Sequence, residues 1–328
     1  MELKLLSPVF LLAAVSASTM GFAIQRGATC TVAAVDEIIS KGSAKRLWAL
    51  MEAALWVALG LGLAQRLQWL GDLPGGYAVS NLTLVGAMLL GLGAWVNKAC
   101  VFGAIARLGS GEWAYAATPL GFYIGCLSEN ALFAPTKPPS LPSQTLMHMA
   151  AAWALWPLLA LLGWRLYALF ERRNKQETLM PTLRAPVAAA WSPHAATVII
   201  GITFLVTVVL AGSWAYTDVL AELAQGMAAS LPGRAFMALA LLVGAMLGGY
   251  TAGRLHWHPL STTGLARCLT GGILMAWGSL LIPGGNDGLI LVGMPLFWPY
   301  AWVAFFVMCI TVGSAQLADA AIRQRLAR

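Results

Sequence analysis

Nine runs of apolar residues divide this chain of 328 residues, and each is about as long as a bilayer is thick. A helix needs about 20 mostly apolar residues to cross the hydrocarbon core of a membrane. The runs lie at residues 6–25, 46–65, 79–97, 112–128, 145–170, 194–212, 235–253, 265–282 and 297–317. Only 10% of the residues are charged, whereas soluble domains carry about 25%. The sequence therefore predicts an all-α integral membrane protein with about nine transmembrane helices.

Four shorter segments rich in glycine are too polar to span a membrane and too apolar for ordinary loops. They lie at residues 27–42, 98–109, 213–230 and 283–294. Irregular backbone is tolerated at membrane depth only where protein or water surrounds it. We therefore expect four short re-entrant helices at these places.

The basic residues are distributed unevenly between the two sides of the predicted bundle. With an outside N-terminus, 16 of the 20 lysines and arginines fall on the inner side. The four on the outer side are Lys4, Arg66, Lys137 and Arg234. Because basic residues collect in cytoplasmic loops, we expect the N-terminus outside and the C-terminus in the cytoplasm. The same bias explains the net charge of +7 without a nucleic-acid partner.

The chain also repeats itself at an offset of about 185 residues. The first matches are Ser7, Pro8, Gly27 and Glu37 with Ser192, Pro193, Gly212 and Glu222. Further matches join RLQW at Arg66–Trp69 with RLHW at Arg254–Trp257, and Gly86 and Gly103 with Gly271 and Gly288. Since residues 7–27 match an internal span, the first apolar run is a structural helix and not a cleaved signal peptide.

The repeat divides the chain into three parts. We expect a first membrane repeat at 1–128 and a second at 192–328. Between them, 129–191 is a linker that holds a connecting transmembrane helix at 145–170 and a basic cytoplasmic loop. The single connecting span inverts the second copy, and inverted repeats with broken helices are typical of transporters with a site at the midplane. The sequence thus predicts an hourglass in which the short helices meet at the centre.

Two cysteines stand at the predicted starts of short helices, each close to a cation. Cys30 follows Arg26, and Cys100 follows Lys98. A helix N-terminus favours an anion and makes a thiol more reactive. Two such thiols are suited to holding a soft anion.

The other three cysteines lie within spans, where we expect them to be packing residues: Cys126, Cys268 and Cys309. None of the five falls in a CxxC or Cys/His ligand spacing, which predicts neither a disulfide framework nor a zinc site. We expect no metal and no cofactor.

Several segments resemble the YeeE/YedE family of sulfur transporters. GFAIQRGATCTVAAV (21–35) and NKACVFGAIARLGSGEWAYAATPLGFYIG (97–125) are similar to its first-repeat motifs, and WAYTDVL and GGNDG occupy its second-repeat places. The resemblance implies uptake of thiosulfate, or a related sulfur-containing anion, across the bacterial inner membrane. In that family, substrate passes along a row of cysteines, which here places Cys30 and Cys100 on the path.

One departure from the family pattern lies in the second half. The family usually carries Gly-Gly-Cys-x-x-Gly there, whereas this chain has Gly284, Gly285, Asn286, Asp287 and Gly288. Gly285 therefore stands where a third cysteine belongs. Asn286 is a donor for an oxyanion, while an ionised Asp287 would repel one. We expect Gly285 and Asn286 to line the path, a thiosulfate transporter to tolerate cysteine at 285, and Arg26 and Lys98 to attract the anion.

Two other functions remain open. The protein is alternatively a membrane partner that passes persulfide sulfur to a soluble TusA-like sulfur carrier protein, or a channel for another small solute on the same scaffold. The histidines do not face each other as haem ligands, and there is no nucleotide motif, so we do not expect an enzyme.

Glu52 lies inside a span, where an acidic residue is functional by default, but near a cytoplasmic end with Lys45 and Arg46.

Overall fold

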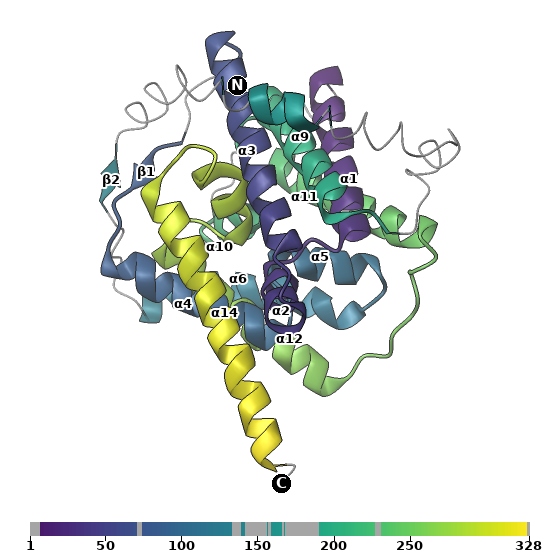
Figure 1. Ribbon diagram of the computed structural model, residues 1–328, viewed down its shortest axis with the longest axis vertical. Helices are drawn as coiled ribbons and strands as arrows, with labels where there is room; N and C mark the ends of the chain where they lie inside the picture. The colour runs from purple at the N-terminus through teal and green to yellow at the C-terminus, as the bar shows by residue number, and fades with distance from the viewer. Residues whose placement is uncertain are drawn as a thin grey trace.

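The computed structural model describes residues 7–70, 74–132, 139–141, 190–226 and 231–326, together with 156, 159–165 and 167. These residues are almost entirely helical (Figure 1). The strands found among them are β1 (Gly76–Tyr77) and β2 (Ser140–Leu141), which pair antiparallel with Gly76 opposite Leu141. Seven helical segments of the described chain are long and apolar enough to cross a membrane. The expectation of an all-α membrane protein is confirmed.

The helices follow the predicted order closely. In the first half they are α1 (Pro8–Gly27), α2 (Thr31–Lys41), α3 (Lys45–Arg66), α4 (Asn81–Asn97), α5 (Val101–Gly109), η1 (Trp113–Ala116) and α6 (Ala117–Leu132). In the second they are α9 (Pro193–Ala211), α10 (Tyr216–Ala224), α11 (Leu231–Thr251), α12 (Thr262–Leu281), α13 (Asn286–Gly288), the π-helical turn η3 (Leu289–Gly293) and α14 (Pro299–Leu326). Most of the predicted connecting helix at 145–170 lies outside the described residues. The total of nine spans and the re-entrance of the short helices stay predictions.

Left-handed residues produce the break before two of the short helices. Ala28 (φ 45°) ends α1 and Lys98 (φ 59°) ends α4. Two residues later the chain is extended at Cys30 and Cys100, which are the N-caps of α2 and α5. The thiols therefore occupy helix starts, as the sequence predicted.

The two halves begin with the same local structure. Ser7 is the N-cap of α1, and its hydroxyl oxygen accepts a hydrogen bond from the N–H of Phe10 at 3.2 Å. Ser192 is the N-cap of α9 and accepts from Ala195 at 3.2 Å. In each case a proline follows at the first helical position, where its fixed φ suits the helix and its missing N–H is not needed.

Helices α4 and α12 cross at glycines that contact each other reciprocally. A Cβ on Gly93 would lie 2.8 Å from the carbonyl oxygen of Gly271, and a Cβ on Gly271 equally close to that of Gly93. Gly86 and Gly278 exclude a side chain from each other in the same way. Because Gly86 and Gly93 correspond to Gly271 and Gly278 at an offset of 185, the contact joins one patch to its own copy, as across a two-fold axis.

The halves are interlocked rather than side by side. Helix α1 packs on α9 and α11, and the equivalent helix α9 packs on α3 (Figure 1). Likewise α12 packs on α6, while α4 packs on α14. Buried apolar side chains of both halves form one continuous core. The short helices lie where the halves meet.

Candidate functional site

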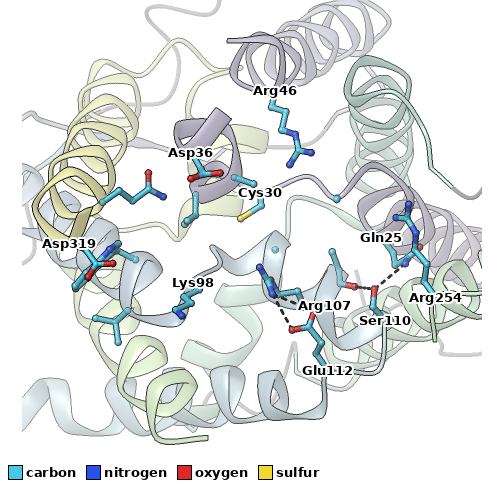
Figure 2. A pocket seen from close by; sticks show the side chains of 18 of the residues that line it. Gln25, Cys30, Asp36, Arg46, Lys98, Arg107, Ser110, Glu112, Arg254 and Asp319 are labelled. Carbon is cyan, nitrogen blue, oxygen red and sulfur yellow. Dashed lines mark hydrogen bonds and ion pairs between the residues drawn. The ribbon is translucent and has the colours of Figure 1, made fainter. Parts of the chain in front are cut away.

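Two cavities open toward the short helices. The larger, about 780 Å³, has five cations among its lining residues and is called the basic cavity here (Figure 2). Those cations are Arg46, Lys98, Arg107, Arg254 and Arg323. The smaller, about 340 Å³, is lined by tyrosines, tryptophans and hydroxyl groups, and Asp218 is its only charged lining residue in the described chain. It is called the acidic cavity.

The two cavities are built from equivalent positions. Eight residues of the basic cavity have their counterpart, 185 residues on, in the wall of the acidic cavity. The pairs are Ala28 and Ser213, Val32 and Thr217, Ala33 and Asp218, Asp36 and Ala221, Trp95 and Leu280, Lys98 and Pro283, Gly103 and Gly288, and Arg107 and Val292. The same backbone thus forms both cavities, with different side chains.

Four helix starts separate the cavities, and they also correspond in pairs. Cys30 (φ −157°, ψ 128°) and Ala215 (φ −132°, ψ 152°) are the N-caps of α2 and α10. Cys100 (φ −73°, ψ −178°) and Gly285 (φ −72°, ψ 174°) are the N-caps of α5 and α13. We call the region around these four residues the constriction. Its backbone is alike in both halves, but only the first half carries thiols.

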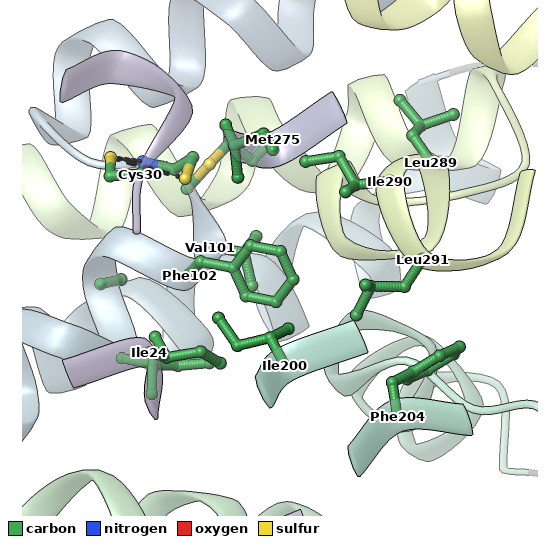
Figure 3. Close-up of a cluster of buried hydrophobic side chains, with 14 of the residues drawn as sticks. Ile24, Cys30, Val101, Phe102, Ile200, Phe204, Met275, Leu289, Ile290 and Leu291 are labelled. Atoms are coloured by element: carbon green, nitrogen blue, oxygen red, sulfur yellow. Dashed lines mark hydrogen bonds between the residues drawn. The ribbon is translucent and has the colours of Figure 1, made fainter. Parts of the chain in front are cut away.

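The two thiols of the constriction are in contact. The Sγ atoms of Cys30 and Cys100 are 3.5 Å apart. Backbone N–H groups donate to both sulfurs, from Thr31 to Cys100 at 3.2 Å and from Cys100 to Cys30 at 3.4 Å. Cys100 is fully buried, whereas Cys30 is 8% exposed and lines the basic cavity. Figure 3 shows Cys30 next to the buried cluster that contains Phe102 and Met275.

Gly103 explains the spacing of the first-half motif. A Cβ on Gly103 would lie only 2.5 Å from the Sγ of Cys30, so a side chain there would displace the thiol. The equivalent Gly288 has Ala215 as its nearest neighbour, at 4.0 Å from a Cβ. The glycine three residues after Cys100 therefore makes room for the sulfur of Cys30.

In the second half, a carboxylate occupies the space beside Gly285. The hydroxyl of Thr217 donates to Oδ1 of Asp287 at 2.6 Å, and the N–H of Thr217 donates to Oδ2 at 3.2 Å. A Cβ on Gly285 would lie 2.7 Å from Oδ1 of Asp287 and would also collide with the Thr217 hydroxyl. A cysteine at 285 would therefore have to displace this pair, and the tolerance expected from the sequence stays a prediction.

Asn286 connects the two halves at the constriction. Its Oδ1 accepts a hydrogen bond from the hydroxyl of Thr31 at 3.2 Å. The side chain is fully buried, and its Nδ2 has no acceptor in the described protein. Buried polar atoms are nearly always hydrogen-bonded, so an Nδ2 without a partner is unusual. That Asn286 donates to an oxyanion stays a prediction.

The cations lie partly elsewhere than predicted. Lys98 lines the basic cavity, as expected. Arg26 does not line it; its guanidinium donates to the Thr251 hydroxyl at 2.8 Å and lies over the ring of Phe22. Sequence reasoning missed Arg107 and Arg254, whose side chains point into the cavity (Figure 2). Arg254 stood in the repeated RLHW segment, which was a usable signal.

Glu52 belongs to a separate ionic cluster. Its carboxylate accepts from Nε and Nη2 of Arg165 at 2.7 and 2.5 Å, and lies 2.6 Å from Nδ1 of His194. Lys45 and Arg46, the partners considered from the sequence, do not form this pair. A buried carboxylate is stabilised only by good partners. Here His194 links α3 to α9, and Arg165 links α3 to the helical segment 159–165.

The helices long enough to cross a membrane, packed around a buried polar centre, define a multi-pass helical membrane protein. Among known families, the one described as Sulphur transport matches residues 26–314. The chain therefore belongs to the sulfur transport family, which confirms the resemblance to YeeE/YedE transporters. No curated protein matches it significantly.

Proposed function

We propose that this protein carries thiosulfate, or a related sulfur-containing anion, through the constriction from the acidic to the basic cavity. Membership of the sulfur transport family supports the substrate class. The observation that carries the proposal is the contact between the Cys30 and Cys100 thiols, at 3.5 Å, among helix starts between two cavities. Soft thiols suit the terminal sulfur of thiosulfate, and helix N-termini suit its charge.

The transport steps need hydrogen bonds only and no covalent chemistry. At the constriction, beyond the wall of the acidic cavity, the free Nδ2 of the buried Asn286 donates to an oxygen of the anion. The anion's terminal sulfur then accepts from the S–H of Cys100 and next from that of Cys30, which faces the basic cavity. There Lys98 and Arg254 attract the anion further, in a wall whose five cations outnumber its three carboxylates. An excess of charge of one sign in a cleft raises the local concentration of its counter-ion.

The two halves act as inverted repeats in this proposal, with nine spans and four re-entrant helices. Three observations support it: the four matching N-caps, the reciprocal glycine contacts of α4 and α12, and the equivalent walls of the two cavities. With the N-terminus outside and the C-terminus in the cytoplasm, the basic cavity faces the cytoplasm of a bacterial inner membrane. Reporter fusions at 171–190 and at the C-terminus test this orientation.

Exchange with a soluble TusA-like sulfur carrier is a second candidate function. The observation in its favour is that Cys30, the more exposed thiol of the pair, lines the basic cavity. A persulfide on Cys30 would be accessible to a carrier docked over that cavity. The third possibility is a channel for another small solute.

One uptake assay separates the three functions. The purified protein is reconstituted in vesicles and supplied with radiolabelled thiosulfate, with and without a purified TusA-like carrier. Uptake without the carrier, together with growth of a host that lacks its own thiosulfate importer, is the expected result. Sulfur that appears only on added carrier would favour the persulfide function. No uptake in either condition, by a protein shown to reach the membrane, would contradict both and leave the channel.

A further inference from the structure

Asp287 is a buried carboxylate without a cation. Only 2% of its surface is exposed, and no lysine or arginine of the described chain forms an ion pair with it. Its partners are the hydroxyl and N–H of Thr217. An unpaired charge at such depth is costly, and acidic residues of this kind mark ion or proton pathways in membrane proteins.

Burial and a neighbouring carboxyl group oppose the ionised form of Asp287, whereas the two Thr217 donors favour it. Helix α10, which packs on α13, carries Tyr216, a second carboxyl group at Asp218, and Glu222. The side chains of α5 beside Asp287 are the apolar Phe102 and Ile105. The η3 turn has no titratable residue. Arg234 of α11 is ion-paired with Glu222.

We propose that Asp287 takes up a proton when an anion enters the constriction, so that the protein transports the anion together with a proton. This inference rests on the proposed function, because it concerns the same path. It resolves the difficulty that an ionised Asp287 would repel the proposed substrate.

The geometry at Thr217 supplies the coupling. When Asp287 is ionised, the Thr217 hydroxyl donates its hydrogen to Oδ1 at 2.6 Å. When a proton binds Oδ1, the new O–H donates back to Thr217 Oγ1 over the same separation, while Oδ2 keeps the N–H. The hydroxyl hydrogen of Thr217 is then released toward the acidic cavity, which this residue lines, and donates to the anion.

A second donor points to the same ligand independently. The fully buried Nδ2 of Asn286, next in sequence to Asp287, has no acceptor in the described protein. Proton binding to Asp287 thus frees the Thr217 hydroxyl as a second donor besides the Asn286 amide. It also removes the negative charge that would repel the anion. By linkage, the two effects are equal in size: bound anion raises the affinity of Asp287 for a proton by the same factor as a bound proton raises the affinity of the site for the anion.

The proton site is confined to the second half. At an offset of 185, Asp287 corresponds to Phe102 and Thr217 to Val32. The two polar residues therefore stand where the first half is apolar, in the half that lacks thiols at its N-caps. The proton site takes the place of the missing third cysteine.

The test follows thiosulfate and protons in vesicles that contain the full-length protein and a pH-sensitive dye. We expect a thiosulfate gradient to drive protons inward. Above the pH at which Asp287 loses its proton, thiosulfate uptake should fall by up to about tenfold for each unit of outside pH. Asp287→Asn, whose amide mimics the protonated acid, should move thiosulfate without protons and without pH dependence. The control is Glu52→Gln, a carboxylate of similar burial that lies in a separate ionic cluster and should keep the pH dependence.

Two further variants separate this role from a structural one. Thr217→Ser should keep coupled uptake, and Thr217→Val should lose it. Thiosulfate uptake without proton movement in the unaltered protein, or coupled uptake that survives Asp287→Asn, would overturn the proposal. Absence of all thiosulfate uptake would refute the proposed function instead. In that case infrared spectra test the proton site separately. Thiosulfate should induce the band of a protonated carboxyl group, and this band should be absent in Asp287→Asn. Without such a band, the proton site is wrong as well.

Discussion

The basic and acidic cavities share a backbone and differ in almost every side chain that carries chemistry. Lys98 and Arg107 of the basic cavity correspond to Pro283 and Val292 of the acidic one, and Ala33 corresponds to Asp218. The thiols of the first half have no counterpart in the second. Duplication thus supplied the shape of the site twice, while its chemistry diverged at a few positions next to the helix starts.

This difference gives the path a direction. Five of the residues that line the basic cavity are cations and three are carboxylates, whereas Asp218 is the only charged residue described in the wall of the acidic cavity. On the proposed path, the net charge of the two walls therefore favours passage of an anion toward the basic cavity. A symmetrical pair of cavities would not have this bias. The following experiments test how the chemistry of the proposed path is divided between the thiols of the first half and the residues around Gly285 in the second.

The largest effect is expected from removing either thiol. Cys30→Ala and Cys100→Ala each remove a hydrogen bond to a charged ligand, worth about 1.5–3 kcal/mol. Since about 1.4 kcal/mol is a factor of ten, and since each step of the passage needs its thiol, uptake of radiolabelled thiosulfate should fall about 100-fold. Cys268→Ala is the matched control, because Cys268 is also fully buried but lies on α12. Equal losses in all three variants would mean that packing explains the sensitivity.

The next largest effect concerns Gly285, which stands where the family pattern has a cysteine. Gly285→Cys would restore the family pattern, but its Cβ collides with Thr217 and lies 2.7 Å from Asp287. Overpacking of this kind costs about 1–3 kcal/mol, so we expect lower thermal stability and roughly tenfold slower uptake.

The double variant Gly285→Cys/Thr217→Ala tests the cause of that loss. It removes the hydroxyl that collides with the new Cβ. The thermal stability of the double variant should therefore lie close to that of Thr217→Ala alone. A fully active and stable Gly285→Cys would show instead that the second half readily accepts a thiol, and the comparison of the halves would then lose its steric basis.

The sequence predicted those features of the fold that depend on local signals. The serine-proline starts at Ser7 and Ser192 follow from capping preferences. The breaks before Cys30 and Cys100 were expected from short polar segments, although the left-handed residues in them are Ala28 and Lys98 rather than glycines. The apolar runs predicted the long helices in the same way. Such features require only neighbouring residues.

The contacts between distant segments were not predictable in this way. Arg26 lies beside Cys30 in sequence, yet its guanidinium reaches Thr251 on α11. Asp287 and Thr217 are far apart in the chain, and only their packing shows that they fill the space beside Gly285. Glu52 likewise pairs with Arg165, across more than a hundred residues. Side-chain direction depends on which helices pack together, and a single sequence does not contain that information directly.

A moderate effect is expected at the junction of the halves. Asn286→Ala removes the hydrogen bond with Thr31 and the free amide that we assign to the anion. We expect the KM for thiosulfate uptake to rise about tenfold, which corresponds to a single lost hydrogen bond to a charged group. Asn286→Asp keeps the shape of the side chain but replaces the donor with a carboxylate, so its KM should be higher than that of Asn286→Ala. Equal KM values in all three proteins would remove Asn286 from the path.

The smallest effect sharpens the comparison on the side of the basic cavity, and it concerns the two cations that lie near the thiols in sequence. Lys98 is exposed in the basic cavity, so Lys98→Gln should reduce uptake by only about threefold, the range of a solvent-screened charge. The loss should shrink as salt is added.

Arg26 is buried and holds Thr251, so Arg26→Gln should lower thermal stability and leave the KM and its salt dependence unchanged. If Arg26→Gln instead changed the KM in a salt-dependent way, the buried arginine would act on the anion through the protein interior. The wall of the basic cavity would then not be the whole source of attraction.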